Sequence, residues 1–453
     1  MTKNMTEGRP LRLILQFALP LLMGNLMQQT YNIIDAAIVG RILGTNALAA
    51  VGATSSVQFL VLGFCIGTCT GFGIPVATHF GAGRGDCVKA MVFHGAVLVI
   101  GLSVILTAFC TWLCSDILHI LSVPEDIFEN AYAYLLVIFL GLPFTLLYNF
   151  LSSILRSVGD SRTPFVFLTI STILNVGLDL FCIVILGWGC AGAAIATVTA
   201  QAVSGFLCLI FIWKKVPVLK PVRENCRLQG RNIQELVAMG VPMGLQFSIT
   251  AIGSMVMQSA NNGLGSIYVS GFTSGMKIKQ FAMCPFDALG SAVSVFCGQN
   301  LGAGKGRRIR QGIIEGMLLG IGYGVAIGLV LIFFGRTLSL LFVSADAAKI
   351  LDASAKYLRC LGYFYWCLGL LNVCRMSTQG LGFSGRTIFA GVVEMLARII
   401  VSCGFVGAYG YTAICFADQS AWLAGCFYIV PMCWICVGKV SRRPNSAVCG
   451  RNA

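Results

Sequence analysis

Residues 31–44, "YNIIDAAIVGRILG", end an apolar run that begins near Leu13. The run is long enough to cross the roughly 30 Å of hydrocarbon in a bilayer, because a helix rises about 1.5 Å per residue. It nevertheless carries Asp35, and a carboxylate near the centre of a membrane helix costs roughly 2.5–3.5 kcal/mol on insertion scales. Arg41 follows only six residues later, a spacing that does not place two side chains face to face on a helix. Asp35 is therefore predicted to be functional.

Comparable apolar segments recur through the whole chain. The 453 residues are 57% hydrophobic and 11% charged, with a mean hydropathy of +0.85, whereas soluble domains carry about 25% charged residues. The chain is predicted to be an all-α polytopic membrane protein with twelve transmembrane helices, at 13–38, 47–73, 88–112, 131–154, 165–187, 190–213, 235–258, 267–297, 312–334, 357–380, 387–408 and 412–437. The span at 267–297 holds Lys277, Lys279, Pro285 and Asp287, and it is expected to line a cavity rather than to face lipid.

The net charge of +14 is distributed according to topology. If both termini and the 214–232 loop are cytoplasmic, the inner segments hold 22 lysines and arginines, and the outer segments hold 4: Arg41, Arg336, Lys349 and Lys356. This asymmetry follows the positive-inside rule and favours the anionic inner leaflet of a plasma membrane. The basic charge therefore gives no support for nucleic-acid binding, and membrane lipid is the expected macromolecular environment.

The residues with metal-binding or catalytic chemistry form no recognisable constellation. Most of the 20 cysteines lie inside predicted spans, including "CWIC" at 433–436, and they are interpreted as small buried hydrophobes rather than a disulfide framework. The histidines at 79, 94 and 119 have no metal-ligand spacing. Neither an enzyme activity nor a cofactor or structural metal is expected.

The basic loop 214–232 divides the chain into two similar halves of six spans. The expected organisation is an N-terminal lobe at 1–213, the cytoplasmic linker 214–232, a C-terminal lobe at 233–440 and a cytoplasmic tail at 441–453. Three pairs of segments carry the repeat: "FALPLLMGNLMQ" (17–28) with "MGVPMGLQFSIT" (239–250), "FGAGRG" (80–85) with "LGAGKG" (301–306), and "LSSILRSVGDSRTPF" (151–165) with "VCRMSTQGLGFSGRTIF" (373–389).

The repeat predicts a mechanism. Because each half has an even number of spans, both halves begin on the same side, and a pseudo-twofold axis along the membrane normal relates the two bundles. Such parallel repeats are typical of alternating-access transporters. The glycine-rich turns "GAGRG" and "GAGKG" lack the G-x-x-x-x-G-K-[ST] spacing of a phosphate-binding loop, so they are interpreted as cytoplasmic turns with glycine at positive φ. With no ATPase cassette in the sequence, an ion gradient is expected to drive transport.

The first half contains the clearest polar set inside predicted spans. Asp35 follows Gln28 by two helical turns, and Asn175 and Asp179 lie at i and i+4 on one face of the fifth span. Thr197 is placed in the sixth span. Two nearby carboxylates in a low dielectric cannot both ionise cheaply, so one is expected to hold a proton or both to share a cation. A structural role inside the bundle is the alternative for Asp179.

Further candidates lie elsewhere in the spans. Asn149 of the fourth span is a possible neighbour of the same cluster. In the second half, Glu394 and Arg398 stand at i and i+4, an order that predicts an intrahelical ion pair with either a structural or a functional role. Asp287 and Lys277 are candidate cleft residues. The remaining Met-, Phe- and Cys-rich surface suits a promiscuous apolar substrate and equally suits ordinary helix packing.

The sequence resembles the MATE (multidrug and toxic compound extrusion) family over about residues 10–440. The resemblance is carried by "ALPLLMGNLMQQTYNIIDAAIVGRILGTNALAAVG" (18–52), "SSILRSVGDSRTP" (152–164), "NVGLD" (175–179), "GWGCAGAAIATVTAQ" (187–201) and "GQNLGAGK" (298–305). It implies two six-helix lobes and export of cationic, amphipathic drugs in exchange for protons or sodium ions.

The resemblance also implies which residues hold the coupling ion. The family's first-lobe site matches Asp35, Asn175 and Asp179, with Thr197 as a further partner. Members that use acidic residues of helices 7 and 10 are not matched, since 235–258 and 357–380 have no interior acid. Small organic cations are the expected partners of a monomeric transporter, coupled to H+ or Na+. The alternative is a flippase for a lipid-linked precursor, with cleft cations among Lys277, Lys279, Arg375 and Arg398.

The charge asymmetry predicts that the 214–232 loop is cytoplasmic. A cysteine in this loop, on a background stripped of the native cysteines, should react with a membrane-impermeant maleimide only after the cells are opened. Labelling from outside intact cells would refute the topology.

Overall fold

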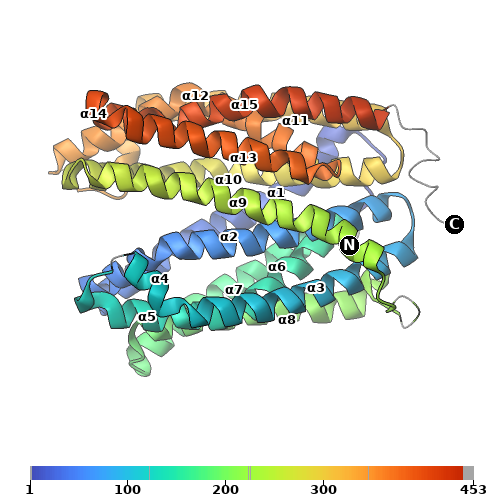
Figure 1. Cartoon of the computed structure of the whole chain (residues 1–453), viewed down its shortest axis with the longest axis horizontal. Coiled ribbons are helices and arrows are strands. Elements are labelled where there is room, and N and C mark those ends of the chain that lie inside the picture. The colour runs from blue at the N-terminus through green and yellow to red at the C-terminus, as the bar shows by residue number, and fades with distance from the viewer. Residues whose placement is uncertain (1–2, 122, 223, 225, 345, 442–453) are drawn as a thin grey trace. The chain divides into compact units, whose positions relative to one another are not determined.

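The computed structural model describes residues 3–441 except 122, 223, 225 and 345. In this part of the chain every regular element is helical, as Figure 1 shows. The predicted cytoplasmic tail at 441–453 lies outside the described residues apart from its first residue. Packing divides the described residues into two compact units, one of residues 3–4 and 23–244, and one of residues 5–22 and 245–441.

The first unit is built from seven long helices and short connecting elements. These are the second part of α1 (Pro10–Ile42), α2 (Thr45–Gly81), α3 (Gly85–Trp112), the short α4 (Cys114–Ile120), α5 (Glu125–Leu140), α6 (Leu142–Ser157), α7 (Arg162–Leu180), the π-helical η1 (Phe181–Ile185), α8 (Gly189–Lys215) and the 3-10 turn η2 (Pro217–Leu219). The first part of α9 (Gly230–Asn262) also belongs to this unit.

The second unit has a corresponding set. It contains the remainder of α1 and α9, α10 (Ser266–Gly302), α11 (Gly306–Ser339), α12 (Ala348–Gly380), α13 (Ser384–Ile399), the π-helical η4 (Ile400–Gly404), the short α14 (Val406–Tyr409) and α15 (Tyr411–Ser441). The boundary between the two units therefore falls within α1 and within α9, shortly after Pro20 and Pro242, respectively. A proline inside a helix removes one backbone hydrogen bond, which makes these positions natural places to bend. The lobe boundaries at 213 and 233 remain predictions.

The predicted all-α fold with twelve membrane helices is confirmed. Within the described residues, 10 helices are long and apolar enough to span a membrane, and α5 with α6 gives an eleventh span with a bend of 46°. The 33-residue α12 corresponds to the predicted span 357–380 and is less apolar than the other long helices. It packs against α10, α11 and α15.

One predicted span differs in the structure. Residues 131–154 were expected as one straight helix, but the chain bends between α5 and α6 at Gly141. Pro143 stands in the first turn of α6. Proline has no N–H to donate, and its ring clashes with the carbonyl group one helical turn earlier. The helix therefore restarts there with a new axis.

The internal repeat is visible in the backbone. A π-helical segment follows α7 in the first unit and α13 in the second, as η1 and η4. The two glycine-rich turns also correspond, with φ of 73° at Gly83 and 68° at Gly304. These are the left-handed conformations predicted for the turns, and glycine adopts them without the steric cost of a side chain. Such π-helical segments are rare and often mark functional sites.

A stripe of glycines lets α11 and α12 pack backbone to backbone. Gly320, Gly324 and Gly328 recur every four residues on α11. On α12, Gly369 lies opposite Gly320 and Gly362 lies opposite Gly328, and Gly324 packs against the backbone between them. A Cβ atom built on Gly328 would lie 2.4 Å from the carbonyl oxygen of Gly362. Small residues at this spacing permit close helix contact where lipid offers no hydrophobic driving force.

This packing predicts that adding a side chain at Gly328 lowers the stability of the protein. Gly328→Ala should destabilise the protein by about 1–3 kcal/mol, because the new methyl group meets backbone that cannot rotate away. Gly322→Ala is the matched control on the same helix, since a Cβ there meets no heavy atom within 4 Å. Thermal unfolding in detergent measures both, and equal midpoints for the two variants would contradict this packing.

Candidate functional site

Helix α7 begins where Asp160 can cap it. The Asp160 Oδ1 atom accepts hydrogen bonds from the backbone N–H groups of Arg162 (3.1 Å) and Thr163 (3.0 Å), and Oδ2 accepts one from the Thr163 hydroxyl (2.7 Å). Two of the unpaired N–H groups of the first turn are thereby satisfied. This start sets the register of the helix, and it places Asn175 and Asp179 on its buried face.

Polar contacts join α7 to α8 along that face. The Ser171 hydroxyl donates to the carbonyl oxygen of Ala200 (2.6 Å), and the Ser204 hydroxyl donates to that of Phe167 (3.2 Å). Asn175 Nδ2 lies 3.5 Å from Thr197 Oγ1, to which it donates. Asn175 and Thr197 are thus brought together as predicted, by two helices whose separation is set by small polar side chains.

The two carboxylates of the predicted site meet at this place. Asp179 is fully buried, and Asp35 on α1 is half-buried. They lie close enough to interact electrostatically with each other, and the Tyr31 side chain interacts with both. The two carboxyl groups are within hydrogen-bonding reach of each other. Apart from that mutual contact, no N–H or O–H group of the described residues donates to either oxygen of Asp179, to Asp35 Oδ1 or to Asn175 Oδ1. Two carboxyl groups can share a hydrogen bond only when one of them holds a proton.

A small cavity adjoins these groups. Its volume is about 30 Å³, and about 10–15 Å³ is enough for a water molecule. It is lined by Gln28, Tyr31, Tyr148, Leu168, Ser171, Thr172, Asn175, Thr197, Ala200, Gln201 and Ser204. The oxygen atoms of this set suit a hard cation, which prefers carboxylate, amide and hydroxyl ligands. A sodium site here would have to draw on amide and hydroxyl groups, since the described residues include no cluster of three His, Cys, Asp or Glu side chains suited to a metal.

Of the remaining candidate residues in the first half, Gln28 lies at the cavity and Asn149 does not. Gln28 lines the cavity, in agreement with its position two turns from Asp35. Asn149 is not brought into the site: its Nδ2 donates to the carbonyl oxygen of Thr145 on the same helix (2.8 Å). The neighbouring Tyr148 reaches the cavity instead.

The predicted ion pair between Glu394 and Arg398 is wrong. The Glu394 Oε1 atom lies 3.2 Å from Nη1 of Arg375 on α12, and Arg398 Nε lies 3.0 Å from Oδ1 of Asp418 on α15. Both α13 side chains are almost fully buried, with 2% and 3% of their surface exposed. A buried charge is compensated best by a charge on a helix packed against it, and the i, i+4 rule describes exposed helix surfaces.

Asp418 is the residue that the sequence interpretation missed. It is fully buried and lies between Lys279 of α10 and Arg398. Lys279 Nζ pairs with its Oδ2, and the Tyr357 hydroxyl donates to the same oxygen (2.9 Å). The signal was available, because Asp418 stands inside the apolar span 412–437 just as Asp35 stands inside the first span.

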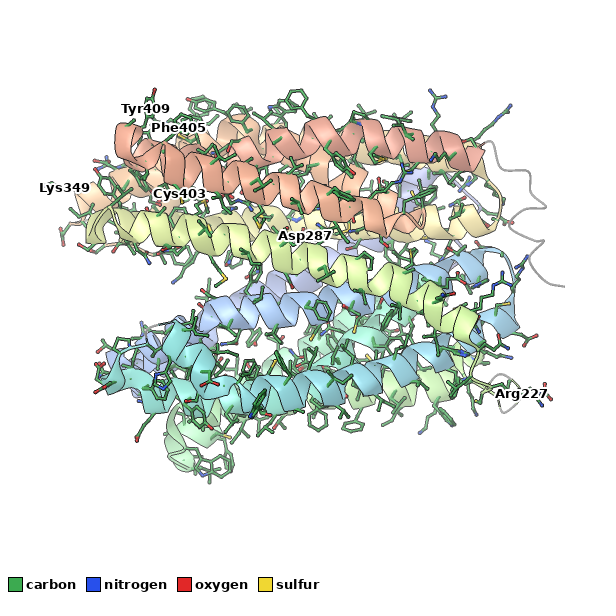
Figure 2. The ribbon with its side chains drawn as sticks, in the orientation of Figure 1. Arg227, Asp287, Lys349, Cys403, Phe405 and Tyr409 are labelled. Atoms are coloured by element: carbon green, nitrogen blue, oxygen red, sulfur yellow. The ribbon has the colours of Figure 1, made fainter. Side chains whose placement is uncertain are left out.

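Asp287 and Lys277 do not form one group. They are ten residues apart on α10, about 15 Å along the helix axis. Asn372 Nδ2 donates to Asp287 Oδ1 (3.0 Å), and Lys277 Nζ lies 5.4 Å from the centre of the Phe342 ring. Asp287, labelled in Figure 2, lies near the middle of α10 and is exposed. A carboxylate exposed at that depth must face an aqueous space rather than lipid.

The twelve membrane helices, the internal repeat and the unpaired intramembrane carboxylates define a polytopic transporter. The sequence model of the MatE family matches this chain twice, at residues 20–181 and 242–403. The chain therefore belongs to the MatE family, and the double match agrees with the internal repeat.

Individual relatives are similar over most of their length. The chain is 28% identical to the probable multidrug resistance protein YpnP of Bacillus subtilis over 424 residues, which cover 93% of this chain and 91% of the relative. It is 26% identical to a FAD transporter of Shewanella oneidensis, with 80% of each chain covered. The fold is similar to that of a MATE protein crystallised with MaL6, with a TM-score of 0.91, 19% identity, and coverage of 98% of this chain and 100% of the other.

The buried Asp418 predicts a large stability effect. Asp418→Asn should cost about 3–5 kcal/mol of unfolding free energy, because Lys279 and Arg398 would share a buried site with no carboxylate. Asp352→Asn is the control: its partner Arg336 lies at 3.2 Å, but both side chains are more than half exposed. Exposed pairs contribute less than about 1 kcal/mol. Equal unfolding free energies in mixed micelles would contradict the structural role of Asp418.

Proposed function

We propose that this protein exports organic cations across the plasma membrane in exchange for protons or sodium ions, by alternating access. The observation that carries the proposal is the pair of carboxyl groups, Asp35 and Asp179, which lie against each other with no cation paired to either among the described residues. Two negative charges in a low dielectric repel each other strongly, and a bound proton or sodium ion would relieve that repulsion.

The neighbours of the pair support a role in ion coupling. Asn175, one helical turn from Asp179, supplies an amide oxygen, and Thr197 of α8 supplies a hydroxyl oxygen, next to a cavity large enough for a water molecule. A proton and a sodium ion both fit this set, so either is proposed as the coupling ion. Neutralising the pair removes its attraction for a positively charged substrate, so ion and substrate would favour different states of the transporter, as antiport requires.

Asp287 is proposed to attract the substrate. It is exposed in the middle of a membrane helix, and Asn372 occupies only its Oδ1 atom. Its other oxygen is available to a positively charged group in the aqueous space that the carboxylate must face. Relatives named for multidrug resistance and multidrug export support drug-like substrates. Both termini are proposed to be cytoplasmic, and the transporter is proposed to act as a monomer without a cofactor.

The alternative, a flippase for a lipid-linked precursor, needs free cations for a phosphate headgroup. Three of its four candidate cations are already paired: Lys279 and Arg398 with Asp418, and Arg375 with Glu394. Lys277 remains as an exposed cation beside the Phe342 ring. One exposed lysine is a weak pyrophosphate site, and the cation exporter is therefore favoured.

Efflux of a cationic dye in everted vesicles tests the proposal. Imposed proton and sodium gradients should be applied separately, and at least one should drive dye accumulation by the unaltered protein. Asp35→Asn should insert normally and lose at least about tenfold in rate, because a neutral side chain cannot exchange a bound cation. Asp352→Asn, a surface carboxylate, should transport normally. Full transport by Asp35→Asn would place the coupling site elsewhere, and transport driven by neither gradient would refute antiport.

A further inference from the structure

Six cysteines form three pairs across the interface between α12 and α15. The pairs are Cys360 with Cys415, Cys367 with Cys426, and Cys374 with Cys433, and in each pair the two thiols are within interaction distance. The α12 members recur every seven residues, so they lie on the helix face that packs against α15. Both helices run in the same direction, and the three pairs follow one another along the interface.

The two sulfur atoms of the middle pair lie close enough to form a covalent bond. The Cys367 thiol lies 3.3 Å from Sγ of Cys426, and the Cys426 thiol lies 3.4 Å from the carbonyl oxygen of Cys367. A disulfide bond is about 2.05 Å long, so the two sulfur atoms need to approach by little more than 1 Å. Both helices are already packed together, and no segment of chain has to be brought from elsewhere.

The middle pair is also the most accessible of the three. Cys426 is half-buried, whereas the other five members are buried. Its neighbours include the ion pair of Arg375 and Glu394, with which it interacts electrostatically. Cysteine oxidation follows exposure and thiolate character, and redox-active cysteines often stand beside a second thiol that can complete a disulfide.

We propose that Cys367 and Cys426 are a redox-active dithiol, which hydrogen peroxide converts into a disulfide between α12 and α15. In the first step the Cys426 sulfur loses its proton and attacks one peroxide oxygen, the O–O bond breaks, and a sulfenic acid and one water are formed. In the second step the Cys367 sulfur loses its proton and attacks the sulfenic sulfur, releasing a second water. The two sulfur atoms together lose two electrons, and the peroxide gains them.

The bond would join two helices that carry much of the polar network of the second unit. Tyr357 and Arg375 of α12 reach Asp418 of α15 and Glu394 of α13, respectively. A covalent link at Cys367 and Cys426 would hold α12 against α15 between these contacts. Any rearrangement that slides one helix along the other would then be blocked until a thiol reductant reopens the bond.

The test is disulfide mapping on the purified full-length protein. The protein is treated with hydrogen peroxide, free thiols are blocked with N-ethylmaleimide, and the digested peptides are measured by mass spectrometry. A cross-linked peptide joining residues 367 and 426 is expected, lighter by two hydrogens than the two separate peptides, and it should disappear on treatment with dithiothreitol. The Cys360–Cys415 and Cys374–Cys433 pairs are internal controls, and at least a fivefold slower cross-linking is expected for both because they are buried.

Two variants complete the design. Cys426→Ser should abolish the 367–426 cross-link and leave Cys367 free for N-ethylmaleimide, whereas Cys226→Ser, in the exposed 214–232 loop, should leave the cross-link unchanged. If Cys426→Ser fails to fold, Cys426→Ala provides the same comparison. The proposal is overturned if N-ethylmaleimide still alkylates both thiols of the native protein after peroxide treatment. It is also overturned if Cys426 is oxidised to a sulfinic acid without cross-linking, or if the buried control pairs cross-link first.

Discussion

Two adjacent carboxyl groups with no cation beside them are the constraint around which the first unit is organised. Asp179 is fully buried, and apart from its contact with Asp35 no group of the described residues donates a hydrogen bond to either of its oxygens. Such a cluster raises the energy of the ionised protein, so the surrounding helices must supply stability from other contacts. The capped start of α7 and its serine contacts with α8 supply part of it, and they hold Asn175 against Thr197.

In the second unit the buried carboxylates are paired with cations. Asp418 is shared by Lys279 and Arg398, and Glu394 is paired with Arg375. Both carboxylates are thus paired with cations inside the protein, so neither needs an external ion beside it. The two similar helix sets therefore differ in their electrostatics: the first holds two carboxylates with no cation paired to them among the described residues, and the second pairs its buried carboxylates Asp418 and Glu394 with cations. That contrast supports the proposal that ion coupling takes place in the first unit.

Much of the fold and part of the site could be predicted from the sequence. The twelve spans follow from apolar length, and Asn175 and Asp179 follow from helical periodicity within a single span. The bend at Gly141 was missed because hydropathy is continuous through it, although Pro143 was a local signal. The Glu394 and Arg398 partners could not be found, because they depend on which helices pack together. Asp418 was overlooked although its position inside an apolar span carried the same information as that of Asp35.

The central claim is that organic cation and coupling ion compete for Asp35 and Asp179. It is tested most directly by adding tetraphenylphosphonium to the purified protein in weakly buffered detergent solution, with pH- and sodium-selective electrodes recording what is released. Release of protons or sodium ions in proportion to the cation bound is expected, and the release should be absent from the combined Asp35→Asn and Asp179→Asn variant. Cation binding without release of either ion, or release that persists in the double variant, would contradict the account.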